Sequence, residues 1–251
     1  MKVKLLASIG FLFLALMSTA TTSAAPSSGN ITVAFIMVGF EDQDFQDEYD
    51  QDYFEDIAFA NSDSMWDYFD EVSKGALNIE GEVFGPYTLD GDAEDYSSGS
   101  SFVRDSVEIA DDDIYFPDFD AVMAIHSGPG GESSGDSNDI WSAHWPSITI
   151  NTDDEDEDGN DHVIRRISQV PEYQLSNGER NPLGVWCHEF GHELGLPDYY
   201  DTDGSSEGVG NWAVMAAGSW GNNGETPVYF SAYSRYWLGW DEPITVEDDV
   251  T

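Results

Sequence analysis

The sequence predicts an α+β fold in which helices pack against a mixed, twisted sheet. Two nearly continuous apolar runs, residues 31–40 (ITVAFIMVGF) and 120–126 (DAVMAIH), have the pattern of strands that are buried on both faces. Other segments place apolar residues at helical spacing, which predicts amphipathic helices. The chain has 251 residues and 40% hydrophobic content, enough to bury the core of one large domain or two small ones.

The first half of the chain begins with the strand at 31–40, which opens the sheet. A helix is predicted over residues 64–74, with Gly75 placed to end it. Residues 76–89 alternate in polarity and are interrupted by glycine and proline, which predicts paired strands. A second helix follows near residues 102–110. The apolar residues that define these helices are Met65, Tyr68, Phe69 and Val72 in the first and Phe102, Val103, Val107 and Ala110 in the second.

The second half begins with the buried strand at 120–126, which leads into the glycine- and serine-rich loop SGPGGESSGDSND. Residues 153–161 (DDEDEDGND) are too charged for a core and predict a loop or a hairpin tip. The last predicted helix is capped by Thr226, continues from Pro227 and ends at Gly239. Its apolar residues are Phe230, Tyr233 and Trp237.

The first 24 residues have the layout of a secretory signal peptide. Lys2 and Lys4 precede the apolar run Leu5–Met17, and small residues follow that run. An uncleaved membrane anchor is the alternative, but a spanning helix needs about 20 apolar residues and this run is shorter. We therefore expect residues 1–24 to be a signal peptide, residues 25–251 to form the mature domain, and the protein to be secreted and extracellular.

Charge and cysteine content narrow the range of partners. The chain has 50 acidic and 8 basic residues and a formal net charge of -42, which disfavours binding to nucleic acid or to anionic membranes. Self-repulsion of this size predicts a halophilic, salt-adapted surface or bound divalent cations, and a merely soluble acidic surface is the alternative. Cys187 is the only cysteine, so no internal disulfide forms, and we interpret it as a small buried hydrophobe.

The most informative stretch is HEFGHELGLPD, residues 188–198. On a helix, His188 and His192 lie one turn apart on the same face, so both imidazoles can reach one ion. Glu189 lies about 100° round the helix, close enough to contact a water at that ion without being a ligand. Two histidines on an ordinary surface helix are the alternative. An apolar stripe on the other side of the helix can pack into the core. It consists of Trp186, Phe190 and Leu194.

The residues after the second histidine extend the pattern to HExxHxxGxxD. Gly195 and Pro197 predict a sharp turn, past which Asp198 can offer a carboxylate as third ligand, although Asp201 or Glu207 could serve instead. Three protein ligands leave one tetrahedral position for water, as in catalytic zinc sites. Zinc lowers the pKa of that water to about 7, and Glu189 would carry its proton to the leaving amine.

These motifs resemble the metzincin clan of zinc peptidases, which carry HExxHxxGxx followed by His or Asp and a downstream Met-turn. More narrowly, HEFGHELGLPDYYD, NWAVMAAGSWG and the late LGW are similar to the immune inhibitor A-like metallopeptidases, which are secreted bacterial and archaeal enzymes. Earlier segments agree: ITVAFIMVGFED, YFDEVSKGALNIEGEVFGPYTL, and AVMAIHSGPGGE before IWSAHW. The resemblance spans residues 31–240.

The resemblance implies a metzincin-like domain with an active-site helix and a C-terminal helical subdomain, separated by a cleft across which substrate lies. It implies that His188, His192 and Asp198 bind zinc and that Glu189 is the catalytic acid and base. Met215 would occupy the Met-turn. Family members commonly carry a long propeptide and further C-terminal domains, whereas here the first strand closely follows the predicted signal and the chain ends abruptly, as a piece of a larger protein would.

Further candidate sites are weaker. His126 and His144 are candidates for contact with substrate or with the developing oxyanion, and a structural role is the alternative for each. Asp154, Asp156 and Asp158 match the start of a calcium loop, but Arg165 stands where the bidentate Glu is needed, so a solvated acidic run is equally consistent.

Two functions remain in competition. The first is a secreted zinc endopeptidase that acts on protein or peptide substrates, with zinc as cofactor and calcium as a candidate second ion. The alternative is a non-enzymatic, acidic, calcium-binding surface or matrix protein with an idle metal helix. The intact Glu189 favours the enzyme, because an idle site has no need of a base beside two ligands. We expect no nucleic-acid partner and no stable membrane insertion, and the sequence does not predict an oligomeric state.

Overall fold

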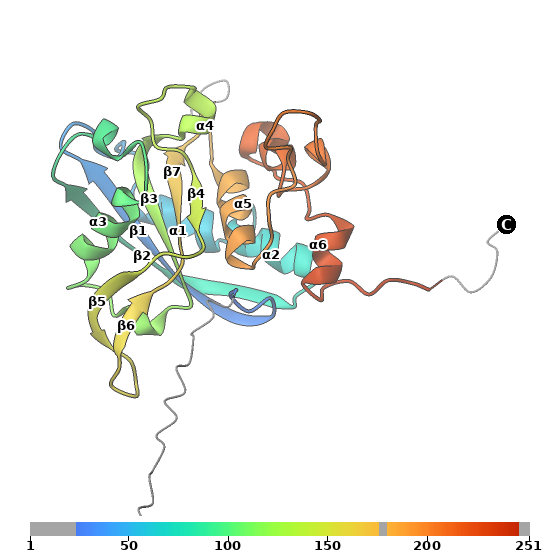
Figure 1. Ribbon diagram of the computed structural model, residues 1–251, viewed down its shortest axis with the longest axis horizontal. Coiled ribbons are helices and arrows are strands. Elements are labelled where there is room, and N and C mark those ends of the chain that lie inside the picture. The colour runs from blue at the N-terminus through green and yellow to red at the C-terminus, as the bar shows by residue number, and fades with distance from the viewer. Residues whose placement is uncertain (1–23, 176–179, 246–251) are drawn as a thin grey trace, which may run out of the picture.

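The computed structural model describes residues 24–175 and 180–245 and has a five-stranded sheet at its centre (Figure 1). The strand order is β2-β1-β3-β7-β4, in which the first three pairings are parallel and β4 is an antiparallel edge strand. The predicted mixed sheet is therefore confirmed. The strands are β1 Gly29–Phe40, β2 Leu77–Leu89, β3 Ala121–Pro129, β4 Ala143–Trp145 and β7 Ile167–Tyr173.

Helices cover both faces of the sheet (Figure 1). The helices α1 (Gln51–Phe59), α2 (Met65–Ser73) and α5 (Leu183–Glu193) share one core with Ile31, Val33, Phe35 and Met37 of β1. The helix α3 (Ser101–Ala110) packs on the other face with Ile36, Val38 and Phe40. The buried run of β1 thus serves two cores, as its continuous apolar pattern predicts. Among the described residues, no helix is long and apolar enough to cross a membrane.

Several local predictions are confirmed. The helix α2 begins after Ser64, whose hydroxyl accepts from the backbone N–H of Asp67, and ends where Lys74 and Gly75 both adopt left-handed backbone angles. The acidic segment forms the tip of a hairpin made by β5 (Ile150–Glu155) and β6 (Asp161–Ile164). Cys187 is fully buried, and burial raises the pKa of its thiol well above the usual range.

The prediction of paired strands at 76–89 is wrong, because the segment is the single strand β2, parallel to β1. Its glycines are not hairpin turns. A Cβ at Gly81 would lie 2.0 Å from the carbonyl oxygen of Val33, so glycine lets the two strands approach. The Gly85–Pro86 interruption coincides with a register shift between Ile36 and Val38 rather than a reversal of the chain.

The last helix is shorter than predicted. It is α6, Ala232–Trp237, and its cap is Ser231, whose hydroxyl accepts from the N–H of Ser234, rather than Thr226. Residues 226–230 lie outside the helix, where backbone bonds from Val228 to Gly218 and from Val214 to Tyr229 hold them. These bonds compete with helix formation. Phe230 still reaches the core, but Tyr233 and Trp237 are exposed.

The C-terminal region, residues 194–245, lies beside α5 (Figure 1) and is less helical than predicted. Apart from α6 it contains only the short 3₁₀ segments η3 (Gly210–Trp212) and η4 (Ala217–Gly224). Three further short elements lie earlier in the chain: η1 (Ala93–Tyr96), η2 (Phe116–Asp118) and α4 (Gly131–Ser134). The predicted signal peptide, residues 1–24, lies outside the described residues except for Ala24.

Candidate metal centre

The helix α5 is fixed in the core by its apolar stripe. Trp186 and Phe190 are fully buried, and Trp186 stacks between Phe35 of β1 and Phe54 of α1 with ring centroids 5.2 and 5.8 Å away. The indole N–H of Trp186 also donates to the carbonyl of Pro171. A helix held this firmly presents the side chains of its other face in a defined direction.

Three potential ligands converge at the end of this helix. His188 and His192 lie on one face of α5, and Gly195 reverses the chain with a φ of 88°. This turn returns Asp198 to the helix, where its Oδ1 lies 3.0 Å from His188 Nε2 and 3.2 Å from His192 Nε2. Among the described residues, this is the one group of three or more His, Cys, Asp or Glu ligand atoms close enough to share an ion.

The far nitrogens of both histidines fix the direction of the ligand lone pairs. His188 Nδ1 lies 2.8 Å from the carbonyl oxygen of Val214, and His192 Nδ1 lies 2.7 Å from that of Leu196. A carbonyl oxygen only accepts hydrogen bonds, so each Nδ1 carries the hydrogen and each neutral imidazole presents a lone pair on Nε2. Two lone pairs and the carboxylate of Asp198 therefore face one another, an arrangement that a shared cation stabilises.

This donor set fits zinc. Zinc accepts imidazole nitrogen and carboxylate oxygen in a tetrahedral site, and three protein ligands are the number that catalytic zinc sites use. Ligating histidines in such sites donate their other N–H to a carbonyl or carboxylate, as His188 and His192 do here. The site residues present therefore suit the metal that the sequence predicts.

The same proximity shifts the acidities of the ligands. Burial is the largest single effect on the pKa of His188 and lowers it, but the hydrogen bond to Asp198, the charges of Glu189 and Asp198 and the contact with Val214 together raise that pKa overall. Burial raises the pKa of Asp198, but its bonds to His188 and His192 outweigh burial and hold that pKa well below the usual range. The two shifts favour a positively charged His188 beside a negatively charged Asp198. The carboxylate therefore attracts positive charge at this point, as the ligands of a cation site do.

Glu189 is buried beside the candidate ligands. It is 6% exposed, and its Oε2 has no hydrogen-bond partner among the described residues. Burial raises the pKa of Glu189 to about 7, although His188 and His192 oppose the shift. A carboxyl group poised near neutrality beside a candidate metal site can both accept and return a proton.

Met215 lies directly against the ligand helix. It is fully buried, and a Cβ added at Gly191 would lie 2.3 Å from its Sδ. The carbonyl of Met215 accepts from the N–H of Tyr199, beside Asp198, and the preceding carbonyl of Val214 holds His188. The segment around Met215 thus contacts α5 and both sides of the ligand set.

The other sequence-predicted residues are divided by the structure. His144 lines the same cleft as the ligands, whereas His126 is buried on the α3 face of the sheet against Phe102, with ring centroids 5.9 Å apart. Asp201 is outside the ligand group; its carboxylate accepts from Ser205 and from neighbouring backbone N–H groups.

The acidic hairpin does not gather its carboxylates round one point. Asp154 accepts from the N–H of Phe116, and Asp156 accepts from Asp158 and Asn160. Within the described chain, these residues belong to no group of converging ligands. A calcium role for Asp154, Asp156 and Asp158 stays a prediction.

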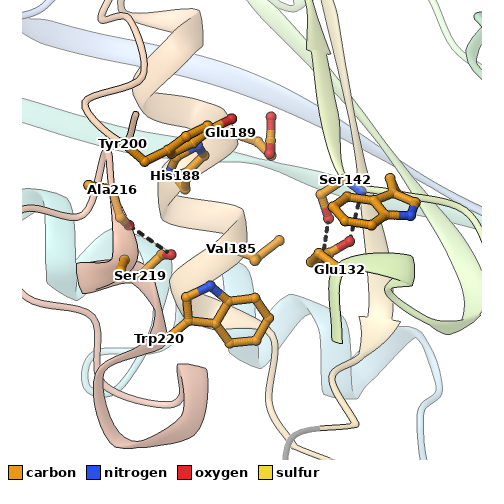
Figure 2. Close-up of a pocket in the computed structure, with 11 residues that line it drawn as sticks. Glu132, Ser142, Val185, His188, Glu189, Tyr200, Ala216, Ser219 and Trp220 are labelled. Atoms are coloured by element: carbon orange, nitrogen blue, oxygen red, sulfur yellow. Dashed lines mark hydrogen bonds between the residues drawn. The ribbon is translucent and has the colours of Figure 1, made fainter. Parts of the chain in front are cut away.

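The cleft beside the ligands has two parts, which meet at His188 and Glu189. One part, of about 550 Å³, is lined by His144, the three ligands and the turn at residues 195–198. The other, of about 280 Å³, is mostly apolar; Figure 2 shows Val185 at its centre, Trp220 on one side and Glu132 on the other. The Glu132 carboxylate accepts from the N–H and hydroxyl of Ser142 and so holds that wall in place.

Sequence reasoning missed several residues of this site. Tyr200 lines both parts of the cleft and stacks on His188, with ring centroids 6.3 Å apart (Figure 2). Burial and the nearby Asp198 raise the pKa of Tyr200 to about 12, so it stays a neutral donor. Its place two residues after Asp198 was the available signal. The roles of the Val214 and Leu196 carbonyls could not be predicted from the sequence, because every residue has a backbone carbonyl.

Comparison with known proteins agrees with this geometry. The family described as immune inhibitor A peptidase M6, catalytic domain, matches residues 105–241. The chain is 28% identical over 250 residues to immune inhibitor A of Bacillus thuringiensis subsp. alesti, covering 77% of this chain and 35% of that protein. It is 26% identical over 252 residues to the pre-pro-metalloprotease PrtV of Vibrio cholerae serotype O1 (strain M66-2), covering 76% and 26%. The chain thus spans about a third and about a quarter of these relatives' lengths.

Proposed function

The chain belongs to the immune inhibitor A peptidase M6 family, and from that premise we propose that it is a secreted, zinc-dependent endopeptidase acting on proteins. One observation carries the proposal: two imidazole nitrogens and a carboxylate oxygen converge beside a buried carboxyl oxygen that has no partner among the described residues. The relatives named immune inhibitor A and pre-pro-metalloprotease PrtV support the peptidase class.

The proposed roles follow from the geometry. His188, His192 and Asp198 hold the metal, which when bound polarises the scissile carbonyl and acidifies water. Glu189 Oε2 accepts a proton from the attacking water as the water oxygen bonds to the carbonyl carbon. The carbon–nitrogen bond then breaks, and Glu189 returns the proton to the leaving amine nitrogen. The pKa of about 7 at Glu189 suits both transfers near neutral pH.

We further propose a metzincin-like arrangement for the domain. Met215 packs against Gly191 of the ligand helix, which supports the proposal that it occupies a Met-turn. The substrate lies across the cleft, and the apolar pocket with Val185 and Trp220 suits a bulky apolar side chain beside the scissile bond. Secretion is supported by the signal-like sequence of residues 1–24.

The alternative, a non-enzymatic calcium-binding surface protein, is not favoured. The family is one of peptidases, and Glu189 is buried beside the ligands instead of on an open face. The acidic hairpin that would carry the alternative offers no converging ligand group within the described residues.

The test is casein cleavage by the purified chain with and without a chelator, together with the variant Glu189→Ala. We expect the variant to keep one zinc per chain and to lose cleavage by about 10²–10⁴-fold, because the ligands remain and the proton carrier is gone. Glu157→Gln, on the exposed hairpin tip, is the matched control and should cleave normally. Hydrolysis that persists in Glu189→Ala would overturn the mechanism.

A further inference from the structure

We propose that His144 is a further catalytic residue, whose Nε2–H donates a hydrogen bond to the carbonyl oxygen of the scissile peptide bond. The inference rests on the proposed peptidase function and deepens it. It concerns the oxygen of the reacting carbonyl, whereas Glu189 acts on protons of the water and the amine. The donor role is therefore separate from that of Glu189 and adds to the polarisation that a bound metal would supply.

His144 lies at the edge of the cleft, next to the ligands. It belongs to β4, the antiparallel edge strand, and lines the part of the cleft that contains His192, Glu189 and Asp198. Its ring stacks on that of His192, with centroids 6.0 Å apart and planes inclined by 24°. A carbonyl group bound on the His192 side of the ligands would therefore lie close to this ring.

One nitrogen of His144 is held and the other has no partner. Nδ1 lies 3.0 Å from the hydroxyl oxygen of Ser168, its opposite residue on β7. The side chain is 4% exposed, and its Nε2 is buried without a hydrogen-bond partner within the described chain. Buried polar atoms in folded proteins are almost always paired, so an unpaired donor at a substrate cleft points to a substrate atom as its partner.

The proposed role uses the tautomer in which Nε2 carries the hydrogen. The Ser168 hydroxyl can donate to His144 Nδ1 at 3.0 Å or to the carbonyl of Glu189 at 3.4 Å, and the shorter contact is the better bond. When Nδ1 accepts this hydrogen bond, a neutral imidazole has its own N–H at Nε2.

The nearby carboxylate of Glu193 could draw the hydrogen to Nδ1 instead, but its charge is balanced by Arg166. Glu193 Oε2 lies 3.5 Å from His144 Nδ1, beyond a good hydrogen bond, and Glu193 Oε1 is paired with Arg166 Nη2 at 2.7 Å. Arg166 also donates to the backbone carbonyl of Glu193. The guanidinium therefore neutralises the charge that would otherwise draw the hydrogen to Nδ1. Ser168, Glu193 and Arg166 are positioning residues for His144.

The test compares His144→Phe and His144→Gln with the wild type. His144→Phe keeps a ring and removes the donor, so we expect kcat to fall about 10²-fold with KM nearly unchanged and one zinc still bound. His144→Gln keeps an N–H donor and should recover part of kcat. A peptide in which a phosphinate replaces the scissile bond mimics the developing oxyanion, and its Kd for His144→Phe should weaken about 10²-fold. The Kd of the product peptide should change little.

Two further variants keep the test interpretable. Ser168→Ala leaves the imidazole in place, and it should weaken phosphinate binding relative to the wild type but less than His144→Phe does. His162→Gln, on the hairpin outside the cleft, is the control. The inference fails if His144→Phe binds the phosphinate as tightly as the wild type, or if zinc is lost in proportion to activity. A zinc-loaded wild type that cleaves nothing would instead refute the proposed function.

Discussion

Replacing Gly191 by alanine tests whether Met215 supports the metal centre. The added Cβ would lie 2.3 Å from Met215 Sδ and 3.0 Å from Phe230 Cε1. Ordinary contacts between such atoms are about 3.5–4.0 Å, so the sulfur must move by more than about 1 Å. Met215 is completely buried and cannot move into solvent, so the strain passes to its neighbours.

The expected magnitudes follow from that overlap. Overpacking costs about 1–3 kcal/mol, and alanine regains about 1 kcal/mol over glycine within a helix, so Gly191→Ala should lower the free energy of unfolding by about 1 kcal/mol. A displaced Met215 also moves the carbonyl of Val214, which accepts from His188 Nδ1. Loss of such an outer contact weakens metal binding by about 10–100-fold.

The assay is a double-mutant cycle with Met215→Ala. Urea unfolding of the metal-free proteins measures stability, and competition with a chromophoric chelator measures zinc affinity. Met215→Ala alone should cost about 2–5 kcal/mol, because it leaves a cavity. In that background Gly191→Ala should be neutral or stabilising, since the contact with Met215 is gone and the ring of Phe230 can shift into the space left by the sulfur. Equal destabilisation in both backgrounds, or unchanged zinc affinity in Gly191→Ala, would refute the reasoning.

Three further predictions follow from the site, the core and the charge. Asp198→Asn should lose zinc in dialysis, whereas Asp201→Asn should keep it; retention by the former would move the third ligand elsewhere. Burial lowers the pKa of His126, so the unfolded chain takes up protons more readily than the folded one below about pH 6.5, and stability falls as pH falls. Relative to His126→Gln, the wild type should lose up to about 1.4 kcal/mol per pH unit there in urea unfolding, and parallel curves would contradict this. With a net charge of -42, the melting temperature should rise from dilute buffer to molar salt, and calorimetry showing no rise would count against a salt-adapted surface.

The parts of the fold that the sequence predicts are those with a local signal. The strand β1 and the helices α2 and α3 follow from periodicity within about ten residues, and each is confirmed. The segment 76–89 carries the same kind of alternation as a hairpin. Its true partner is β1, nearly 50 residues earlier, so no local pattern distinguishes the two pairings.

The site divides in the same way. His188, Glu189 and His192 are predictable, because their spacing on one helix determines where their side chains point. Asp198 depends on a turn, and the sequence left Asp201 and Glu207 open as alternatives. The closeness of His144 to His192 depends on the pairing of β4 with β7, which the sequence did not predict.

The charge of the cleft favours a bound cation. Glu132, Glu189 and Asp198 line it, and among the described residues no lysine or arginine does. Burial favours the neutral acid form of Glu189, whereas Asp198 stays ionised. The hydrogen bonds at Nδ1 of His188 and His192 turn the lone pairs of both Nε2 atoms toward that carboxylate. In a chain with 50 acidic residues, general surface charge only adds to this repulsion. A bound divalent ion would remove this repulsion. The same ion would also stabilise negative charge that develops on a substrate oxygen, so the protein would need few further donors for that oxygen, such as His144 Nε2.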